Sequence, residues 1–322
     1  MSRLLYPSIQ PYQTGFLSVS EQQKIYYEQS GDPSGIPVVY LHGGPGAGSN
    51  KNFRCYFNPD VYRIIQFDQR GCGQSLPSPS IEHNDVAHLL ADMEQLRQQL
   101  SIEKWLVAGG SWGSTLALLY GIAYPQRVTA FLLRGIFLGT TEEYNWLYHD
   151  NGAARFFPEY YQEFLAPLQT ELQTDPLSAY HELLNSTNEI AATAAGKAWY
   201  LWESRLSSIE NFNLAHLQVE DTHQALCTAK ISSHYFFNHC FIEPDFIVNH
   251  LNRIEHIPAT IVHGRYDMVC QLHYAHLLTQ HWQNAKLHIM PCAGHSGLER
   301  QTVDAMCKAA DQLARFLSEH KE

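Results

Sequence analysis

The feature that most constrains this chain is the string Gly-Gly-Ser-Trp-Gly at residues 109–113. It follows the apolar run 105–108 and precedes a helical pattern that begins at Ser114. A strand, the pattern G-x-S-x-G and then a helix is the setting of a nucleophile elbow, a strained turn that exposes its serine at the carboxyl end of a sheet. Glycines two residues to either side of Ser111 let the strand and the helix approach without a Cβ clash. The pattern therefore predicts a nucleophilic Ser111, with a glycine-rich turn that carries an incidental serine as the alternative.

Short apolar runs alternate with helical patterns over most of the sequence. Six runs are apolar on both faces, as expected for central strands of a mostly parallel sheet. They are residues 38–41, 63–67, 106–108, 130–133, 260–262 and 287–290. Segments 13–19 and 24–29 alternate partially and predict an N-terminal hairpin. Helices are expected after an N-cap at Asn84, at 115–123 and at 303–317, so the predicted fold is α/β, a three-layer sandwich around a mostly parallel central sheet.

The strand signal stops between about residue 138 and residue 237. This segment is rich in Tyr, Trp, Phe, Ala and Glu, and its apolar residues show helical spacing in patches. Because it interrupts the succession of strands, we expect a helical cap domain at 138–237. The core domain would then consist of residues 1–137 and 238–322, with the cap lying over the carboxyl ends of its strands.

Composition and charge exclude several classes of protein. Of the 322 residues, 45% are hydrophobic and 16% are charged, which predicts a packed core. The formal net charge of −11 argues against nucleic acid and against a membrane surface as partners, since both attract clustered Lys and Arg. No apolar run approaches the ~20 residues of a membrane span. Residues 1–13 also lack the unbroken apolar stretch of a signal peptide.

The cysteines and histidines show no metal-binding or disulfide pattern. The 7 cysteines are odd in number, widely spaced and without a C-x-x-C pair. None of the 18 histidines lies in an H-E-x-x-H string. We therefore expect a cytoplasmic protein with no metal and no organic cofactor. The sequence leaves the oligomeric state open, with a homo-oligomer among the alternatives.

A serine hydroxyl needs a base to become nucleophilic at neutral pH, and the base needs an acidic group to orient it. Downstream of an elbow of this kind, the acid and then the base follow on loops after late strands. Asp267 ends the string Gly-Arg-Tyr-Asp after one late apolar run, and His295 follows the last run. We therefore expect Asp267 to orient His295, and His295 to act as general base for Ser111. A turn aspartate and a surface-loop histidine are the alternatives.

The same chemistry needs two backbone donors for a negatively charged oxygen. One is the N–H of Trp112, directly after the serine. The other should come from the loop after an early strand, where residues 42–46 read His-Gly-Gly-Pro-Gly. The N–H of Gly44 is the first candidate and that of Gly43 the second. A phosphate-binding turn is the alternative, but this loop lacks the G-x-G-x-x-G and Walker patterns.

Five strings together resemble the prolyl iminopeptidases, which are serine peptidases of the α/β-hydrolase fold that remove an N-terminal proline. They are H-G-G-P-G at 42–46, D-Q-R-G-C-G-Q-S at 68–75, G-G-S-W-G-S-T-L-A at 109–117, G-R-Y-D at 264–267 and G-H-S at 294–296. The resemblance extends from about residue 12 to about residue 317 and includes the helical insertion. It implies an α/β-hydrolase fold with a cap, an acyl-enzyme intermediate on Ser111, and small peptides with an N-terminal proline as substrates.

The resemblance also implies how the substrate is bound. Family members hold the protonated amine with glutamates of the cap, and the string Trp-x-x-Trp-Glu at 199–203 makes Glu203 one of them. Ser232 stands where the second glutamate would be. Since a charge-assisted hydrogen bond contributes roughly 1.5–3 kcal/mol, this replacement would weaken amine capture by about ten- to a hundredfold unless another carboxylate compensates. The candidates for compensation are Glu210, Glu220 and Asp221. The positions of the family's apolar proline pocket correspond to Phe137, Tyr148, Phe236 and Cys270, with ordinary core packing as the alternative.

Two other functions stay open at this point. Ser232 suggests an esterase or amidase of the same fold that acts on small acylated substrates without a free amine. A catalytically silent binding module built on this fold is the other alternative. The presence of a serine, an aspartate and a histidine at all three expected places argues against it.

Overall fold

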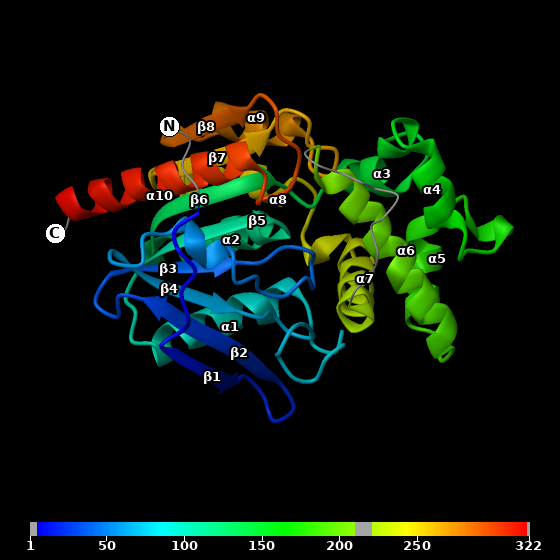
Figure 1. The fold of residues 1–322 in the computed structure, drawn as a ribbon, viewed down its shortest axis with the longest axis horizontal. Helices are drawn as coiled ribbons and strands as arrows, with labels where there is room; N and C mark the ends of the chain where they lie inside the picture. Colours follow the sequence, from blue (N-terminus) through cyan, green and yellow to red (C-terminus); the bar gives the residue numbers. More distant parts are fainter. Residues whose placement is uncertain (1–4, 210–220, 321–322) are drawn as a thin grey trace.

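The computed structural model describes residues 5–209 and 221–320 (Figure 1). Its centre is an eight-stranded sheet with the strand order β1-β2-β4-β3-β5-β6-β7-β8. Strands β3 to β8 run parallel to one another, whereas β1 and β2 are antiparallel and lie at one edge. The strands are β1 (Gln13–Ser18), β2 (Lys24–Gly31), β3 (Ile36–Leu41), β4 (Tyr62–Phe67), β5 (Trp105–Ser111), β6 (Val128–Ile136), β7 (Ala259–Gly264) and β8 (Ala285–Met290).

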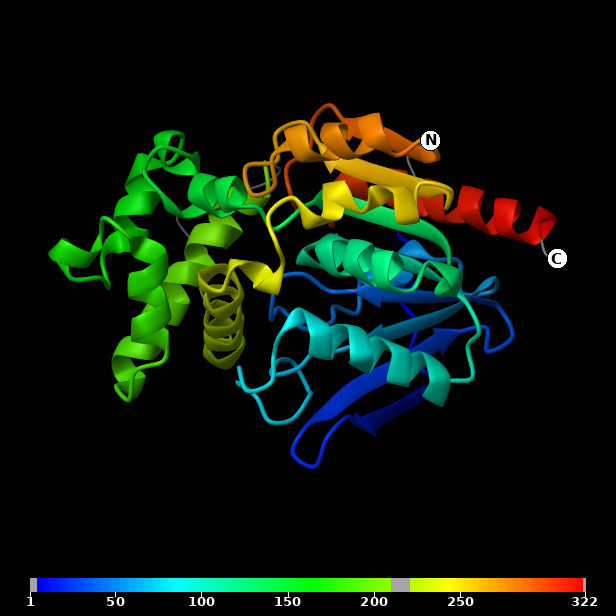
Figure 2. The same cartoon turned by 180° about the vertical axis from the view of Figure 1, so that it is seen from behind.

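Helices cover both faces of the sheet (Figures 1 and 2). Side chains of α1, α2 and α9 join one apolar cluster, and α10 builds the other. Alternate residues of a strand enter different clusters: Val39 and Leu41 face the first, and Val38 and Tyr40 the second. The helices are α1 (Val86–Gln99), α2 (Trp112–Ala123), α3 (Thr141–Tyr148), α4 (Pro158–Leu165), α5 (Pro176–Leu184), α6 (Glu189–Ser207), α7 (Thr222–Phe237), α8 (Phe246–Asn249), α9 (Leu272–His281) and α10 (Arg300–Glu319). The predicted three-layer α/β fold is confirmed.

The expected strands and helices are present, and one local prediction is wrong. The N-terminal hairpin pairs as β1 and β2, and each of the six apolar runs lies within one of the strands β3 to β8. The N-cap of α1 is Asp85, not Asn84: the Asp85 carboxylate accepts a hydrogen bond from the N–H of His88. Asn84 is instead buried, where its side chain donates to the Arg70 carbonyl and accepts from the Tyr235 hydroxyl.

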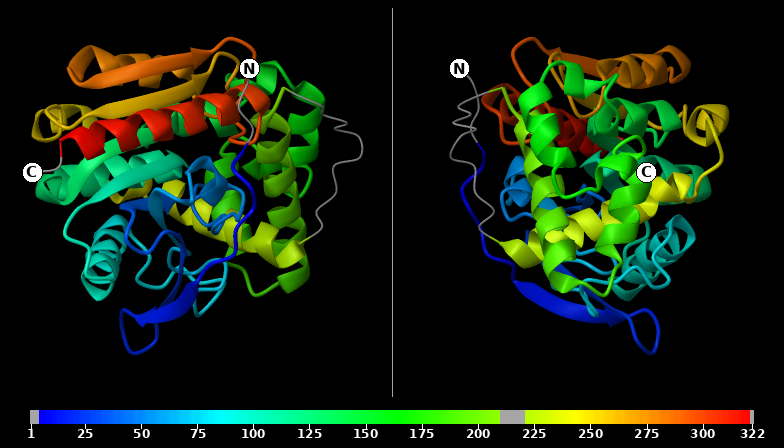
Figure 3. Two further views of the ribbon diagram at one scale, coloured as in Figure 1. Left: turned by 60° about the vertical axis from the view of Figure 1, so that its left-hand side comes forward. Right: turned by 90° about the vertical axis from the view of Figure 1, so that its right-hand side faces the viewer.

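Five helices, α3 to α7, form a separate group at the end of the sheet where β6 leads into them (Figures 1 and 3). We call this group the helical layer. Its interior is aromatic, with Phe164 4.6 Å from Tyr180 and Tyr148 4.4 Å from Trp199 between ring centroids, and it is continuous with the apolar cluster of α1, α2 and α9. The chain returns from α7 through α8 to β7. The helical layer therefore faces the carboxyl ends of the central strands.

The described part of the chain lacks two kinds of feature. None of the helices in residues 5–209 and 221–320 is both long and apolar enough to cross a membrane. Within the same ranges, no three His, Cys, Asp or Glu side chains group in a way that could hold a metal ion.

Candidate active site

Ser111 occupies the turn between β5 and α2. Its backbone has φ 58° and ψ −131°, a conformation that costs a non-glycine residue energy and is typical of functional turns. A Cβ at Gly113 would overlap the Leu41 carbonyl oxygen, and a Cβ at Gly109 would lie 2.5 Å from the Gly113 carbonyl oxygen. Only glycine therefore lets β3, β5 and α2 meet here. The tight turn leaves Ser111 partly exposed at the carboxyl end of β5.

Asp267 and His295 meet on the loops after β7 and β8. The Nδ1 of His295 lies 2.8 Å from Oδ2 of Asp267, and the aspartate side chain is fully buried. The other oxygen, Oδ1, accepts hydrogen bonds from the N–H groups of Val269 (3.0 Å) and Cys270 (2.7 Å). Burial alone would raise the pKa of Asp267, but the nearby imidazole of His295 and these hydrogen bonds hold that pKa below its usual value. Asp267 is thus an ionised acceptor that fixes the His295 ring.

A second histidine supports this pair. Nδ1 of the buried His263 accepts from the N–H of Ile136 (3.2 Å), so Nε2 carries the proton and donates to the Cys270 carbonyl (2.9 Å). Burial lowers the pKa of His263, which keeps the ring neutral. Its Nε2 also lies 3.5 Å from Oδ2 of Asp267. His263 therefore holds the loop that carries Asp267.

Ser111 and His295 line the same cavity, which has a volume of about 380 Å³. Both side chains lie in the described part of the chain, and no hydrogen bond joins them there. In enzymes such pairs often reach that geometry only when substrate binds. Backbone approaches closely behind the imidazole, since a Cβ at Gly135 would lie 3.0 Å from Cε1 of His295. Arg134 donates from Nη1 to the His295 carbonyl (3.0 Å) and so fixes the backbone of this loop. The arrangement places an imidazole and a serine hydroxyl around one space, with the orienting carboxylate buried against the imidazole.

The loop after β3 brings glycine backbone against the serine. Gly43 and Gly44 line the cavity, and a Cβ at Gly43 would lie 3.2 Å from the Ser111 Cβ. The Gly43 carbonyl is held by Nδ1 of His42 (2.9 Å) and by the N–H of Ala47 (3.2 Å). Because a peptide unit is planar and trans, the N–H of Gly44 points the opposite way from that carbonyl.

His42 has a defined protonation state. Its Nε2 accepts from the N–H of Gln69 (3.0 Å), so Nδ1 is the donor toward Gly43. Burial lowers the pKa of His42 and keeps the ring neutral. The second expected backbone donor, Trp112, opens α2, where N–H groups lack helical acceptors. The Trp112 indole donates to the Gln69 side chain (2.9 Å), so one glutamine ties both donor segments together.

Glu203 reaches the cavity from α6 in the helical layer. Its Oε1 accepts from the Tyr148 hydroxyl (2.5 Å) and from the Trp199 indole (2.7 Å). Within the described ranges, Oε2 receives no hydrogen bond. Burial raises the pKa of Glu203 to about 7, although both hydrogen bonds lower it. One carboxylate oxygen is therefore left for a ligand.

The other predicted binding residues divide into two groups. Phe137, Phe236 and Cys270 line the cavity, whereas Tyr148 lies behind Glu203 as its hydrogen-bond donor. Ser232 does not line the cavity: it is fully buried and donates to the Pro45 carbonyl (2.8 Å). Among the candidates for compensation, Asp221 caps α7 by accepting from the N–H of Gln224. Glu210 and Glu220 lie outside the described residues.

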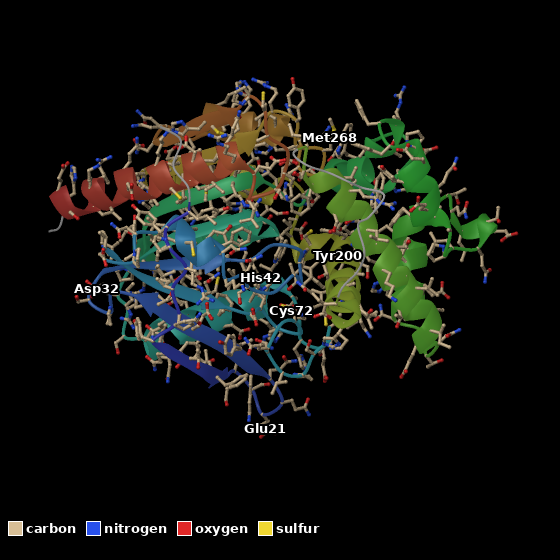
Figure 4. The ribbon with its side chains drawn as sticks, viewed as in Figure 1. Glu21, Asp32, His42, Cys72, Tyr200 and Met268 are labelled. Carbon is tan, nitrogen blue, oxygen red and sulfur yellow. The ribbon has the colours of Figure 1, made fainter. Side chains whose placement is uncertain are left out.

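Several residues of this region were missed by sequence reasoning. Tyr200 and Ser204 line the cavity beside Glu203, and Thr228 lines it from α7. Figure 4 shows Tyr200 on the helical layer and His42 on the side of the sheet. The spacing was an available signal, because Glu203 and Ser204 lie three and four residues after Tyr200 on one helix. His42 and His263 carried none, because their roles depend on partners far away in the sequence.

A family model described as the alpha/beta hydrolase fold matches residues 36–300, so the chain is an α/β hydrolase. Solved structures agree on the fold: an esterase from Rhodococcus sp. ECU1013 superimposes with a TM-score of 0.61 at 18% identity, covering 96% of this chain and 99% of that one. A putative lipase from Acinetobacter baumannii AYE gives 0.60 at 16% identity, covering 95% and 91%.

Curated relatives show which family of α/β hydrolases the chain belongs to. A proline iminopeptidase of Xylella fastidiosa (strain Temecula1) is 44% identical over 97% of this chain and 99% of its own length. One from Neisseria meningitidis serogroup A is 42% identical over 97% of this chain and 100% of its own length. One from Arabidopsis thaliana is 44% identical over 92% and 78%. The chain belongs to the proline iminopeptidase family, the family that the sequence motifs resembled.

Proposed function

We propose that this chain is a serine aminopeptidase that releases N-terminal proline from small peptides. Ser111 Oγ attacks the carbonyl carbon of the first residue while His295 takes the hydroxyl proton. His295 then gives this proton to the leaving amine, and the prolyl group stays on Ser111 as an ester. Water, deprotonated by the same imidazole, hydrolyses the ester and frees proline. Asp267 keeps the imidazole oriented and stabilises its positive charge in both steps.

The backbone donors take the negative charge that develops on the carbonyl oxygen. We assign this role to the N–H groups of Gly44 and Trp112, with Gly43 as the second choice on its loop. Support comes from the position of the Gly43–Gly44 backbone against Ser111 and from the opening of α2 directly after it. Removing one such donor typically raises the barrier by about 3–4 kcal/mol.

The observation that carries the proposal is the placement of Glu203 in the same cavity as Ser111. A protonated secondary amine needs an anionic acceptor, and Oε2 of Glu203 is available for it. Apolar walls from Phe137 and Phe236 suit the pyrrolidine ring. An amine held at a fixed place relative to the nucleophile limits cleavage to the first peptide bond.

We further propose that residues 138–237 act as a cap domain on a core formed by 1–137 and 238–322. The cavity is lined from both sides, by the loops after β3, β5 and β8 and by α6 and α7. A covered cavity of this kind excludes long or internal segments of a polypeptide, so short peptides are the expected substrates. Seven free thiols, six of them buried, support a reducing, cytoplasmic setting, which cell fractionation would test.

Kinetics on p-nitroanilides test the function directly. The kcat/KM on proline p-nitroanilide should exceed that on the leucine and alanine compounds by at least tenfold, and N-acetylation of the proline should abolish turnover. Equal turnover of all three, or turnover of the acetylated compound, would refute the proposal.

Ser232 favours a second candidate, an esterase or amidase for small acylated substrates. With a serine at this position, Glu203 is the carboxylate that lines the cavity among the described residues. This candidate predicts efficient cleavage of p-nitrophenyl butyrate with no dependence on a free amine. The substrate panel above separates the two.

A further inference from the structure

Helix α7 contacts the oxyanion loop (residues 42–47) through three hydroxyl or amide side chains. They lie four residues apart along one face of the helix, and each donates to a different backbone carbonyl of the loop. The pairs are Ser232 Oγ to Pro45 (2.8 Å), Thr228 Oγ1 to Gly46 (3.3 Å) and Gln224 Nε2 to Ala47 (3.1 Å). Three successive carbonyl groups are thus held by a helix about 180 residues further along the chain.

The loop and the helix also pack closely against each other at Gly46. Gly46 has φ +91°, and a Cβ there would lie 2.8 Å from the Cβ of Ile231. Ser232 and Thr228 are both buried, at 0% and 5% exposure. Buried hydroxyls and carbonyls without partners are costly, so these hydrogen bonds specify one position for the loop.

Two peptide planes connect Thr228 to the proposed oxyanion donor. Thr228 holds the Gly46 carbonyl, and the N–H of the same peptide unit, on Ala47, donates to the Gly43 carbonyl (3.2 Å). That carbonyl shares its peptide unit with the N–H of Gly44. Since each peptide unit is planar, fixing the Gly46–Ala47 unit orients the Gly43–Gly44 unit through this hydrogen bond. Ser232 fixes the neighbouring unit through Pro45.

We propose that Thr228 and Ser232 are positioning residues for hydrolysis: they set the direction of the Gly44 N–H from the helical layer. This inference rests on the proposed serine-hydrolase mechanism and goes beyond it. It gives Ser232 a role in stabilising the transition state, through the position of the loop. It does not give Ser232 a role in binding the substrate amine. The helical layer then completes the catalytic site as well as covering it.

Two pairs of variants test this proposal. Ser232→Ala removes the donor to Pro45, while Ser233→Ala is the matched control, because the buried Ser233 hydroxyl donates only to Lys230 within α7. Thr228→Val removes a hydroxyl at constant shape, and Thr228→Ser keeps it. Each variant is assayed on proline p-nitroanilide and p-nitrophenyl acetate. Its affinity is measured for a proline boronic acid, whose tetrahedral adduct on the serine places an oxygen at the donors.

We expect Ser232→Ala and Thr228→Val to lower kcat by about tenfold on both substrates, a part of what losing a whole donor costs. The KM for proline p-nitroanilide should stay within twofold for Ser232→Ala, and boronate affinity should fall in proportion to kcat/KM. Ser233→Ala should behave like the unmodified protein, and Thr228→Ser, which keeps the hydroxyl, should recover most of the activity that Thr228→Val loses.

The proposal is overturned if Ser232→Ala changes KM alone, if it matches Ser233→Ala, or if boronate affinity is unchanged. If Ser232→Ala does not fold, the Thr228→Val and Thr228→Ser comparison decides by the same criteria. If the unmodified protein cleaves the ester but not the proline compound, the aminopeptidase function is refuted. The ester data still test the positioning role in that case.

Discussion

At the scale of single residues, the candidate catalytic residues could be predicted where a sequence motif marks them. The role of a residue could not be predicted where it depends on a partner far away in the sequence. Ser111 ends a strand, and Asp267 and His295 each follow one, all three in recognisable strings. The structure brings Nδ1 of His295 to 2.8 Å from Oδ2 of Asp267. Ser232 was expected at the substrate, but its hydroxyl turns to the Pro45 carbonyl. The sequence alone does not show that Ser232 and Pro45 are in contact.

Glu203 gives the sharpest prediction at this scale. We expect Glu203→Gln to raise the KM for proline p-nitroanilide by about ten- to a hundredfold, because an amide forms a weaker hydrogen bond with an ammonium group than a carboxylate does. The effect on p-nitrophenyl acetate should be much smaller. Glu189→Gln, an exposed position in the first turn of the same helix, is the control. An equal loss on both substrates would show that Glu203 supports the fold and not the amine.

At the scale of elements, the apolar runs located strands β3 to β8 but not their full length. The predicted run 106–108 is the middle of β5, which extends to Ser111 because Gly109 and Gly110 pair with β6. Glycines carry no side chain, so the periodic signal ends before the strand does. The N-cap of α1 was predicted one residue too early, because the sequence does not show which of two suitable residues has another partner. Asn84 and Asp85 both suit a cap, and the Tyr235 hydroxyl from the helical layer engages Asn84 instead.

Gly113→Ala tests the elbow as an element. Alanine favours helix over glycine by about 1 kcal/mol, but here its Cβ would overlap the Leu41 carbonyl oxygen. We expect the free energy of unfolding to fall by at least about 2 kcal/mol, measured by urea denaturation. The exposed helical substitution Gln98→Ala should stay within about 0.5 kcal/mol. A stabilised Gly113→Ala would contradict the proposed close contact.

At the scale of the whole molecule, the helical layer was predicted as a segment, and its position was inferred from the interruption of the strands. Its detailed fit was not predictable. Contacts such as Tyr235 to Asn84 and Thr228 to Gly46 join residues 151 and 182 positions apart. The layer also brings buried acids with it. Burial raises the pKa of both Glu143 and Glu203 to about 7.

These acids make stability depend on pH. Between about pH 4.5 and pH 7 the folded protein keeps a proton on Glu143 that the unfolded chain releases, so the free energy of unfolding falls as pH rises through this window. Glu143→Gln should remove up to about 3 kcal/mol of the difference between pH 4.5 and pH 8 in urea denaturation. Glu142→Gln, at the exposed neighbouring position, should leave that difference unchanged. An unchanged difference in Glu143→Gln would contradict the raised pKa.

The account depends most on Ser111 being a nucleophile activated by His295 and Asp267. Labelling with a fluorophosphonate, followed by peptide mass spectrometry, measures this directly. We predict one covalent adduct per chain, on Ser111, with activity lost in proportion, and labelling slowed by about 10³-fold or more in Asp267→Asn. An adduct on another residue, or full activity with Ser111 modified, would contradict the central claim.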